Sequence, residues 1–86
     1  MTTTTTTAQL RAARALLRMP ADRLAELSGV SLVTIRRAEA RDGPIRMMPA
    51  NLDAIRRALE AAGIEFIPED DDSGAGVRLR KQAAQG

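Results

Sequence analysis

The stretch LAELSGVSLVTIRRAEA, residues 24–40, has the pattern of two amphipathic helices separated by a glycine. Apolar residues occur at helical spacing before Gly29, and they return at helical spacing after it. Gly29 is expected to end the first helix, because glycine adopts the left-handed conformation without a side-chain clash. Ser31 is the candidate N-cap of the second helix, which we expect to run from about residue 32 to residue 40.

The sequence on either side predicts two further helices. Residues 8–18, AQLRAARALLR, carry leucine and alanine at spacings of three and four. Met19 ends this helix, because the residue before a proline disfavours the helical conformation. Pro20 then begins the helix that stops at Gly29, since proline is tolerated in a first helical turn. A fourth helix is expected over about residues 50–62.

The hydrophobic period changes from 3.6 to 2 after residue 63. IEFIP, residues 64–68, and VRLR, residues 77–80, alternate apolar and polar side chains around the turn-rich sequence EDDDSGAG. This pattern predicts an antiparallel β-hairpin with an acidic loop. Strands this short must pack on helices or pair with another chain. We expect two copies of the chain to share one apolar face, formed by Ile64, Phe66, Val77 and Leu79.

The expected fold is therefore mainly α, with four helices and a short C-terminal β-hairpin. Residues 1–7 are interpreted as a disordered, threonine-rich tail in which Thr7 is a candidate N-cap. We expect residues 8–62 to form the helical domain, residues 63–81 to form the hairpin that serves as the dimerisation element, and residues 82–86 to be a frayed tail. Met47 and Met48 are expected to fill the core beneath the loop of residues 41–48.

The composition argues against an enzyme. The 86 residues include no cysteine and no histidine, so there is no thiol nucleophile, no disulfide and no imidazole base or ligand. The acidic loop lacks the alternating spacing of a calcium loop, and we expect no metal, cofactor or small-molecule ligand. No apolar run approaches the length of a membrane span, which favours a soluble, cytoplasmic protein.

The basic residues are almost all arginine, 12 of 13, and they are unevenly distributed. Residues 1–62 carry ten arginines against six acidic residues, whereas residues 63–86 carry three basic residues against five acidic ones. Arginine is suited to bidentate recognition of phosphate and of guanine edges. A GC-rich genome would give the same composition, so composition alone does not decide for nucleic acid.

Two short helices joined by a tight glycine turn form a helix-turn-helix arrangement, in which the second helix is free to enter a major groove. LRAARALL, residues 10–17, and GVSLVTIRRAE, residues 29–39, resemble the DNA-binding domain of the Cro and lambda-repressor (XRE) family. The resemblance covers roughly residues 10–62. It implies an ion pair between Arg14 and Glu39, and a bacterial transcriptional regulator that binds an inverted-repeat operator as a homodimer.

The candidate DNA contacts lie on the second helix of this motif and in the loop after it. They are Ser31, Leu32, Val33, Thr34, Arg36, Arg37, Arg41, Arg46 and Asn51. Arg36 and Arg37 are expected to provide the hydrogen-bonded readout of bases. Ala21 stands where the family usually has a DNA-contacting glutamine. Leu32 and Val33 replace the family's polar pair, and either touch thymine methyl groups or are buried against the loop.

A protein-binding module is the alternative function. In that case the hairpin edges would engage a protein partner, such as a toxin or another regulator, and the helical domain would be a scaffold with little DNA affinity. The apolar pair at Leu32 and Val33 and the missing glutamine favour this alternative. The sequence does not choose between phage, plasmid, mobile-element and antitoxin regulators.

Overall fold

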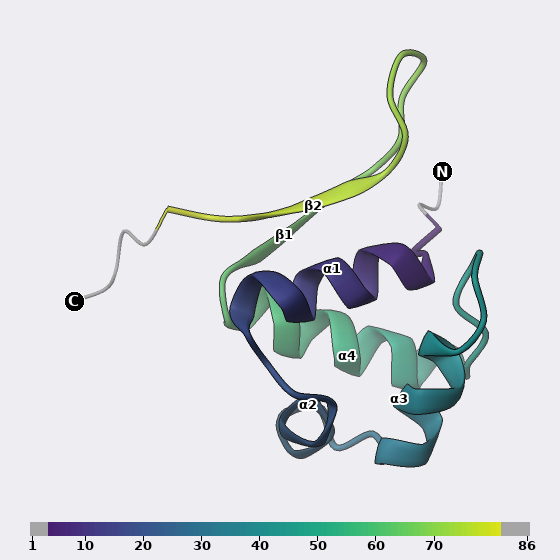
Figure 1. The fold of residues 1–86 in the computed structure, drawn as a ribbon, viewed down its shortest axis with the longest axis vertical. Coiled ribbons are helices and arrows are strands. Elements are labelled where there is room, and N and C mark those ends of the chain that lie inside the picture. The colour runs from purple at the N-terminus through teal and green to yellow at the C-terminus, as the bar shows by residue number, and fades with distance from the viewer. Residues whose placement is uncertain (1–3, 82–86) are drawn as a thin grey trace.

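The computed structural model describes residues 4–81, which form four helices followed by a two-stranded hairpin (Figure 1). The elements are α1 (Thr7–Leu17), α2 (Ala21–Ser28), α3 (Leu32–Glu39), α4 (Pro49–Ala61), β1 (Ile64–Ile67) and β2 (Gly76–Leu79). The strands pair antiparallel, with Ile64 opposite Leu79 and Phe66 opposite Val77. The mainly helical class with a short C-terminal hairpin is therefore confirmed, and the expected boundaries differ from the observed ones by at most one residue.

The turn between α2 and α3 has the predicted geometry. Gly29 takes φ +76°, and its N–H donates to the carbonyl of Ala25 at 2.9 Å. The Ser31 side chain accepts a hydrogen bond from the backbone N–H of Thr34, which caps α3. The turn lets the two helices cross steeply. In Figure 1, α2 is seen along its axis, whereas α3 lies in the plane of the view.

A single core joins all four helices to the first strand. Its fully or almost fully buried members are Leu10, Ala13, Leu24, Val30, Ile35, Ala38, Ile55, Leu59 and Ile64. Branched aliphatic side chains and alanine fill this core without any aromatic residue at its centre. Phe66 lies at its margin and stacks under the guanidinium of Arg56, 4.7 Å from the ring centroid.

The hairpin packs on its own helices, which corrects the predicted dimer face. Ile64 is completely buried in the core, and Phe66 and Val77 are partly buried against it. Only Leu79 of the four expected dimer residues is largely exposed, at 46%. The alternation correctly grouped these side chains on one face. That face is covered within the chain, because β2 packs on α1 and β1 packs on α4.

The threonine-rich segment is not a disordered tail over residues 4–7, which corrects a second prediction. Thr6, rather than Thr7, is the N-cap of α1, and it forms a reciprocal capping box with Gln9. Thr5 and Thr7 are buried. The expected frayed tail at 82–86 and the first three residues lie outside the described part of the chain.

One side chain expected in the core is exposed. Met47 packs against the core, but Met48 is 69% exposed because it is the N-cap of α4 and faces outward. Within residues 4–81, no helix is long and apolar enough to cross a membrane.

Candidate nucleic-acid interface

The outer face of α3 combines two arginines with a small apolar surface. Ile35 and Ala38 point into the core, so the residues at Val33, Arg36 and Arg37 fall on the opposite side of the helix and are exposed. Val33 is 58% exposed, whereas Leu32 is only partly exposed. Of the predicted apolar pair, Val33 is thus the side chain that is available for contact.

The two hydroxyl groups at the start of α3 are held to each other. Ser31 Oγ accepts from the N–H of Thr34 and donates its proton to Thr34 Oγ1 at 2.9 Å. The two hydroxyls share one hydrogen bond, which leaves one hydroxyl proton of the pair free to donate to a phosphate.

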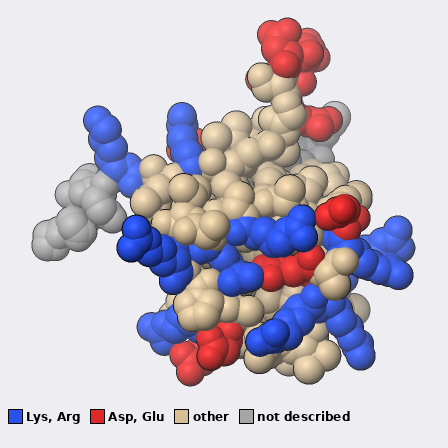
Figure 2. Space-filling model, viewed as in Figure 1, with Lys and Arg blue, Asp and Glu red and all other residues tan. Residues whose placement is uncertain are grey.

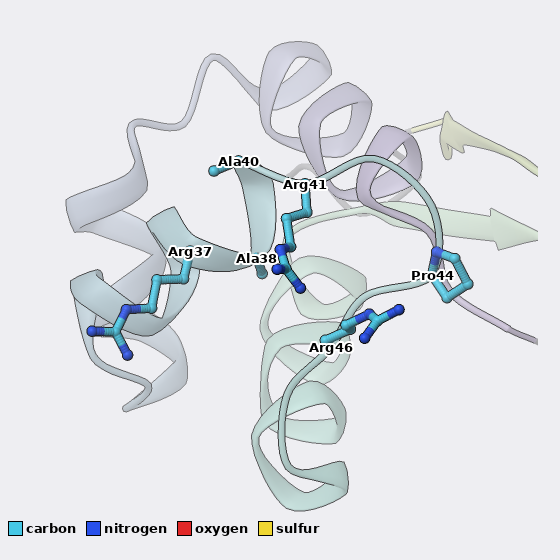
Figure 3. A pocket seen from close by; sticks show the side chains of 6 residues that line it. All are labelled: Arg37, Ala38, Ala40, Arg41, Pro44 and Arg46. Atoms are coloured by element: carbon cyan, nitrogen blue, oxygen red, sulfur yellow. The ribbon is translucent and has the colours of Figure 1, made fainter.

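An open hollow of about 410 Å³ lies between the end of α3 and the loop that follows it. Its walls are Arg37, Ala38, Ala40, Arg41, Pro44 and Arg46, and we refer to it as the arginine hollow (Figure 3). Arg37 comes from α3, Arg41 from just beyond its end, and Arg46 from the returning arm of the loop. The guanidinium groups of Arg41 and Arg46 face each other across this space, whereas the side chain of Arg37 extends away from them (Figure 3).

The arginines of this region differ from most others in lacking carboxylate partners. Arg11, Arg14, Arg23, Arg56, Arg57 and Arg78 each lie within 4.0 Å of an aspartate or glutamate oxygen. Over residues 4–81, no such ion pair includes Arg36, Arg37, Arg41 or Arg46. The two acidic residues of this region, Glu39 and Asp42, pair instead with Arg14 and Arg11 of α1.

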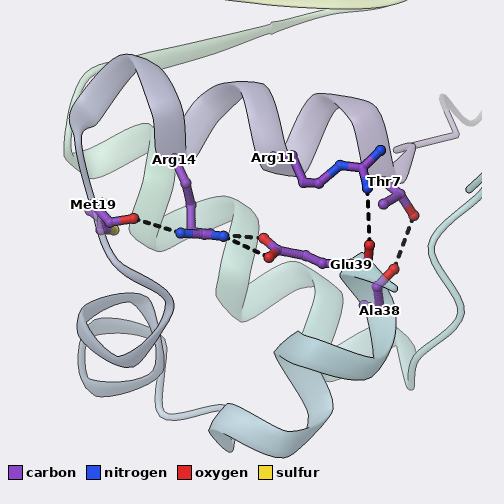
Figure 4. A network of polar contacts seen from close by, with 6 residues as sticks. All are labelled: Thr7, Arg11, Arg14, Met19, Ala38 and Glu39. Atoms are coloured by element: carbon purple, nitrogen blue, oxygen red, sulfur yellow. Dashed lines mark hydrogen bonds and ion pairs between the residues drawn. The ribbon is translucent and has the colours of Figure 1, made fainter. Parts of the chain in front are cut away.

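The ion pair expected between α1 and α3 is present and bidentate (Figure 4). Arg14 donates from Nε to Glu39 Oε2 at 2.8 Å and from Nη2 to Oε1 at 2.6 Å. Its Nη1 donates to the carbonyl of Met19, which ties the end of α1 into the same network. The hydrogen bonds from Arg14 to Glu39 raise the pKa of the guanidinium above its ordinary value, against the opposing effect of burial.

Two further contacts hold the C-terminal end of α3 against α1. Arg11 donates to the carbonyl of Glu39 at 3.2 Å and to Asp42 Oδ1 at 3.1 Å. The Thr7 hydroxyl donates to the carbonyl of Ala38 at 3.1 Å (Figure 4). Since α3 is only eight residues long, these bonds to α1 contribute to fixing its position.

Asn51 lies apart from the other candidates in its local chemistry. It is half-buried in the first turn of α4, where Pro49 has no N–H and the N–H groups of Asn51 and Leu52 donate to the carbonyl of Met48. This start of α4 therefore offers few free amides to an anion.

The acidic side chains at residues 69–72 are exposed and gather at the tip of the hairpin, away from the helical body (Figure 2). The described residues hold no cluster of metal-ligating side chains.

The sequence identified the three arginines of the hollow but not that they surround one space. Ala40 and Pro44, which complete its walls, have no distinguishing chemistry, and pairing of arginines with distant carboxylates is not visible in a linear sequence.

Compared with models of known protein families and with curated proteins, the chain shows no match.

Proposed function

We propose that this protein is a sequence-specific double-stranded DNA-binding regulator of transcription of the lambda-repressor-like helix-turn-helix type, with the exposed face of α3 in the major groove. The observation that carries the proposal is the set of four arginines without carboxylate partners on α3 and the following loop. The donors of these arginines are not occupied by carboxylates, and arginine forms strong bidentate hydrogen bonds with phosphate.

The contacts divide by position along the chain. Arg36 and Val33 lie on the exposed face of α3, so they are assigned to base edges, an arginine to guanine and a valine to a thymine methyl group. The arginine hollow is assigned to the sugar-phosphate backbone, where Arg41 and Arg46 contact phosphates. Arg37 lies both on α3 and at the hollow, so it is assigned to either a base edge or a phosphate. Phosphate contacts fix the register of the helix, and base contacts determine the preferred sequence.

The distribution of acidic residues supports the same orientation. In Figure 1 the hairpin tip projects from one side of the helical body, and α2 and α3 lie on the other. The tip carries Glu69, Asp70, Asp71 and Asp72. A duplex bound along α3 would thus stay clear of the most acidic part of the chain, and the field of the molecule would favour this approach over the reverse one.

The proposal includes a homodimer on an inverted repeat, with half-sites about 34 Å apart. The apolar face of the hairpin is largely occupied within the chain, so pairing would use exposed Leu79 and the outer edges of a two-stranded sheet. Unpaired strand edges are suited to pairing with a second chain.

A protein-binding module is the second candidate function. It is favoured by exposed apolar side chains, Val33 at 58%, Met48 at 69% and Leu79 at 46%, together with the open edges of the hairpin. These side chains lie on separate elements, and a partner covering them would leave the four arginines of α3 and its loop without an assigned role.

The proposal is tested by titrating labelled duplexes from upstream of the protein's own gene at two salt concentrations, with a scrambled duplex as competitor. We expect binding that survives the competitor and weakens steeply with salt, because neutralised phosphates release counterions. Footprinting then gives the half-site spacing. Equal binding to native and scrambled duplexes, or none, contradicts sequence-specific regulation and favours the protein-binding alternative.

A further inference from the structure

We propose that the N-terminal strap, residues 4–7, positions the loop arginines for phosphate binding, so that duplex affinity depends on Thr5 and Thr7 although neither lines the arginine hollow. The inference rests on the proposed function. It gives a role in DNA binding to a segment that lies outside the helix-turn-helix motif and carries no charged side chain.

The strap and the loop are joined through their backbones. The N–H of Thr7 donates to the carbonyl of Gly43 at 2.9 Å, and the N–H of Ile45 donates to the carbonyl of Thr5 at 3.1 Å. These two bonds enclose an isolated antiparallel bridge between Thr6 and Pro44. The strap therefore pairs with the loop as a short strand would.

No other part of the described chain holds the loop in this way. Within the described residues 4–81, the backbone of residues 41–47 makes only these two hydrogen bonds to other backbone groups. Gly43 adopts φ +101°, and the loop carries no helix or named strand of its own. Without the strap the loop would be held by side-chain contacts alone, such as the packing of Ile45 and Met47 on the core, and it would sample more conformations at a cost in entropy on binding.

The strap also touches the walls of the arginine hollow directly. Thr7 donates its hydroxyl proton to the carbonyl of Ala38, and Thr6 bridges to Pro44. Ala38 and Pro44 are two of the six residues that line the hollow. On the other side, Arg56 Nη1 donates to Thr5 Oγ1 at 3.2 Å, which anchors the strap to α4. The strap thus links α4, the end of α3 and the loop.

Two consequences follow for binding. An ordered strap holds Arg41 and Arg46 in place before phosphate arrives, which lowers the ordering cost of the complex. Thermodynamic linkage then requires the converse, that a bound duplex protects the strap–loop hydrogen bonds from opening. Both effects are measurable without knowledge of the preferred DNA sequence.

The experiment compares chains that lack residues 1–5 and residues 1–3, with amide hydrogen exchange and duplex binding as readouts. Removing residues 1–5 deletes the carbonyl that accepts from Ile45, so exchange at Ile45 is expected to accelerate about tenfold while exchange at buried Leu59 does not. Duplex affinity is expected to fall about tenfold and its salt dependence to weaken by about two phosphate contacts. The chain lacking residues 1–3 keeps all these values.

A point variant guards against a deletion that fails to fold. Thr7→Val keeps the side-chain volume and removes the hydroxyl that donates to Ala38, and it is expected to weaken duplex binding severalfold and reduce the salt slope. Thr4→Val, at an exposed position, is the matched control.

Unchanged affinity and salt slope in both strap variants, despite faster exchange at Ile45, overturn the positioning role and leave the proposed function intact. An intact chain that binds no duplex overturns both.

Discussion

The ion pair between Arg14 and Glu39 gives a prediction whose size follows from the structure. Glu39→Gln removes the charge that two hydrogen bonds from Arg14, of 2.6 and 2.8 Å, now satisfy. The two side chains retain only 21% and 12% of their exposure. Loss of one partner from a fully buried pair costs about 3–5 kcal/mol. Partial solvation, and the remaining bond to Met19, reduce the expected loss of unfolding free energy to about 2–4 kcal/mol.

That loss is large for a domain of this size. A stability of about 0.05–0.15 kcal/mol per residue gives roughly 4–13 kcal/mol for the whole chain. Denaturant unfolding followed by circular dichroism at 222 nm measures the change, provided that the slope with denaturant is unchanged. Arg14→Met and the double variant complete a cycle that isolates the coupling between the two side chains.

The matched control is Glu26→Gln, which breaks the exposed pair with Arg23 on α2, where the side chains are 69% and 57% exposed. We expect this control to change stability by less than about 0.5 kcal/mol. Equal effects at Glu39 and Glu26, or a coupling energy near zero between Arg14 and Glu39, would refute the claim that this pair fixes α3 against α1.

Three further predictions concern the turn, the hairpin and the oligomeric state. Gly29→Ala is expected to lower the unfolding free energy by about 1–2 kcal/mol, because φ is +76° and an L-residue is strained in this conformation. The added Cβ would meet no atom within 4 Å, so the backbone strain is the whole expected effect. Gly74→Ala, at an equally open position without positive φ, should be near neutral in the same denaturation assay. The hydrogen bond from Arg78 lowers the pKa of Glu65, so this carboxylate stabilises the fold above its unfolded pKa of about 4.3, and the contribution is lost as the pH falls toward the lower folded value. Glu65→Gln should therefore flatten the pH dependence of stability below about pH 5, and an unchanged profile would contradict this. Sedimentation equilibrium should show a dimer that Leu79→Glu weakens, whereas a monomer at all concentrations would remove the dimer from the proposal.

Local chemistry allowed the helical part of the fold to be predicted from sequence. Gly29 and Ser31 supply the left-handed turn and the cap that separate α2 from α3, and each acts through its immediate neighbours. The threonine run has no apolar period, so its hydrophobic pattern does not predict the ordered structure of residues 4–7. Gln9, three residues after Thr6, is the capping-box signal that would have placed the start of α1 correctly.

Predictions that depended on distant parts of the chain were less successful. The alternation in the hairpin grouped Ile64 with Phe66, but it carried no information on whether that face meets another chain or the helices of its own. The resemblance, rather than the spacing, supplied the pairing of Arg14 with Glu39. That Arg41 and Arg46 face the same space is a property of the loop path, which is set by hydrogen bonds to residues 5 and 7.

The central claim is that the uncompensated arginines around the hollow contact DNA phosphates. It is tested most directly by comparing two triple variants with the same change in net charge. One replaces the three arginines of the arginine hollow with glutamine. The control replaces Arg23, Arg57 and Arg78, which are exposed and ion-paired elsewhere on the surface.

Duplex affinity is measured for both variants between 50 and 200 mM salt, on the order of the range over which phosphate contacts dominate binding. The account predicts that the hollow variant reduces the slope of log affinity against log salt by about three per chain, whereas the control changes it by less than about one. Equal losses in the two variants would show that DNA responds only to net charge, and would contradict the assignment of the arginine hollow as the phosphate-binding site.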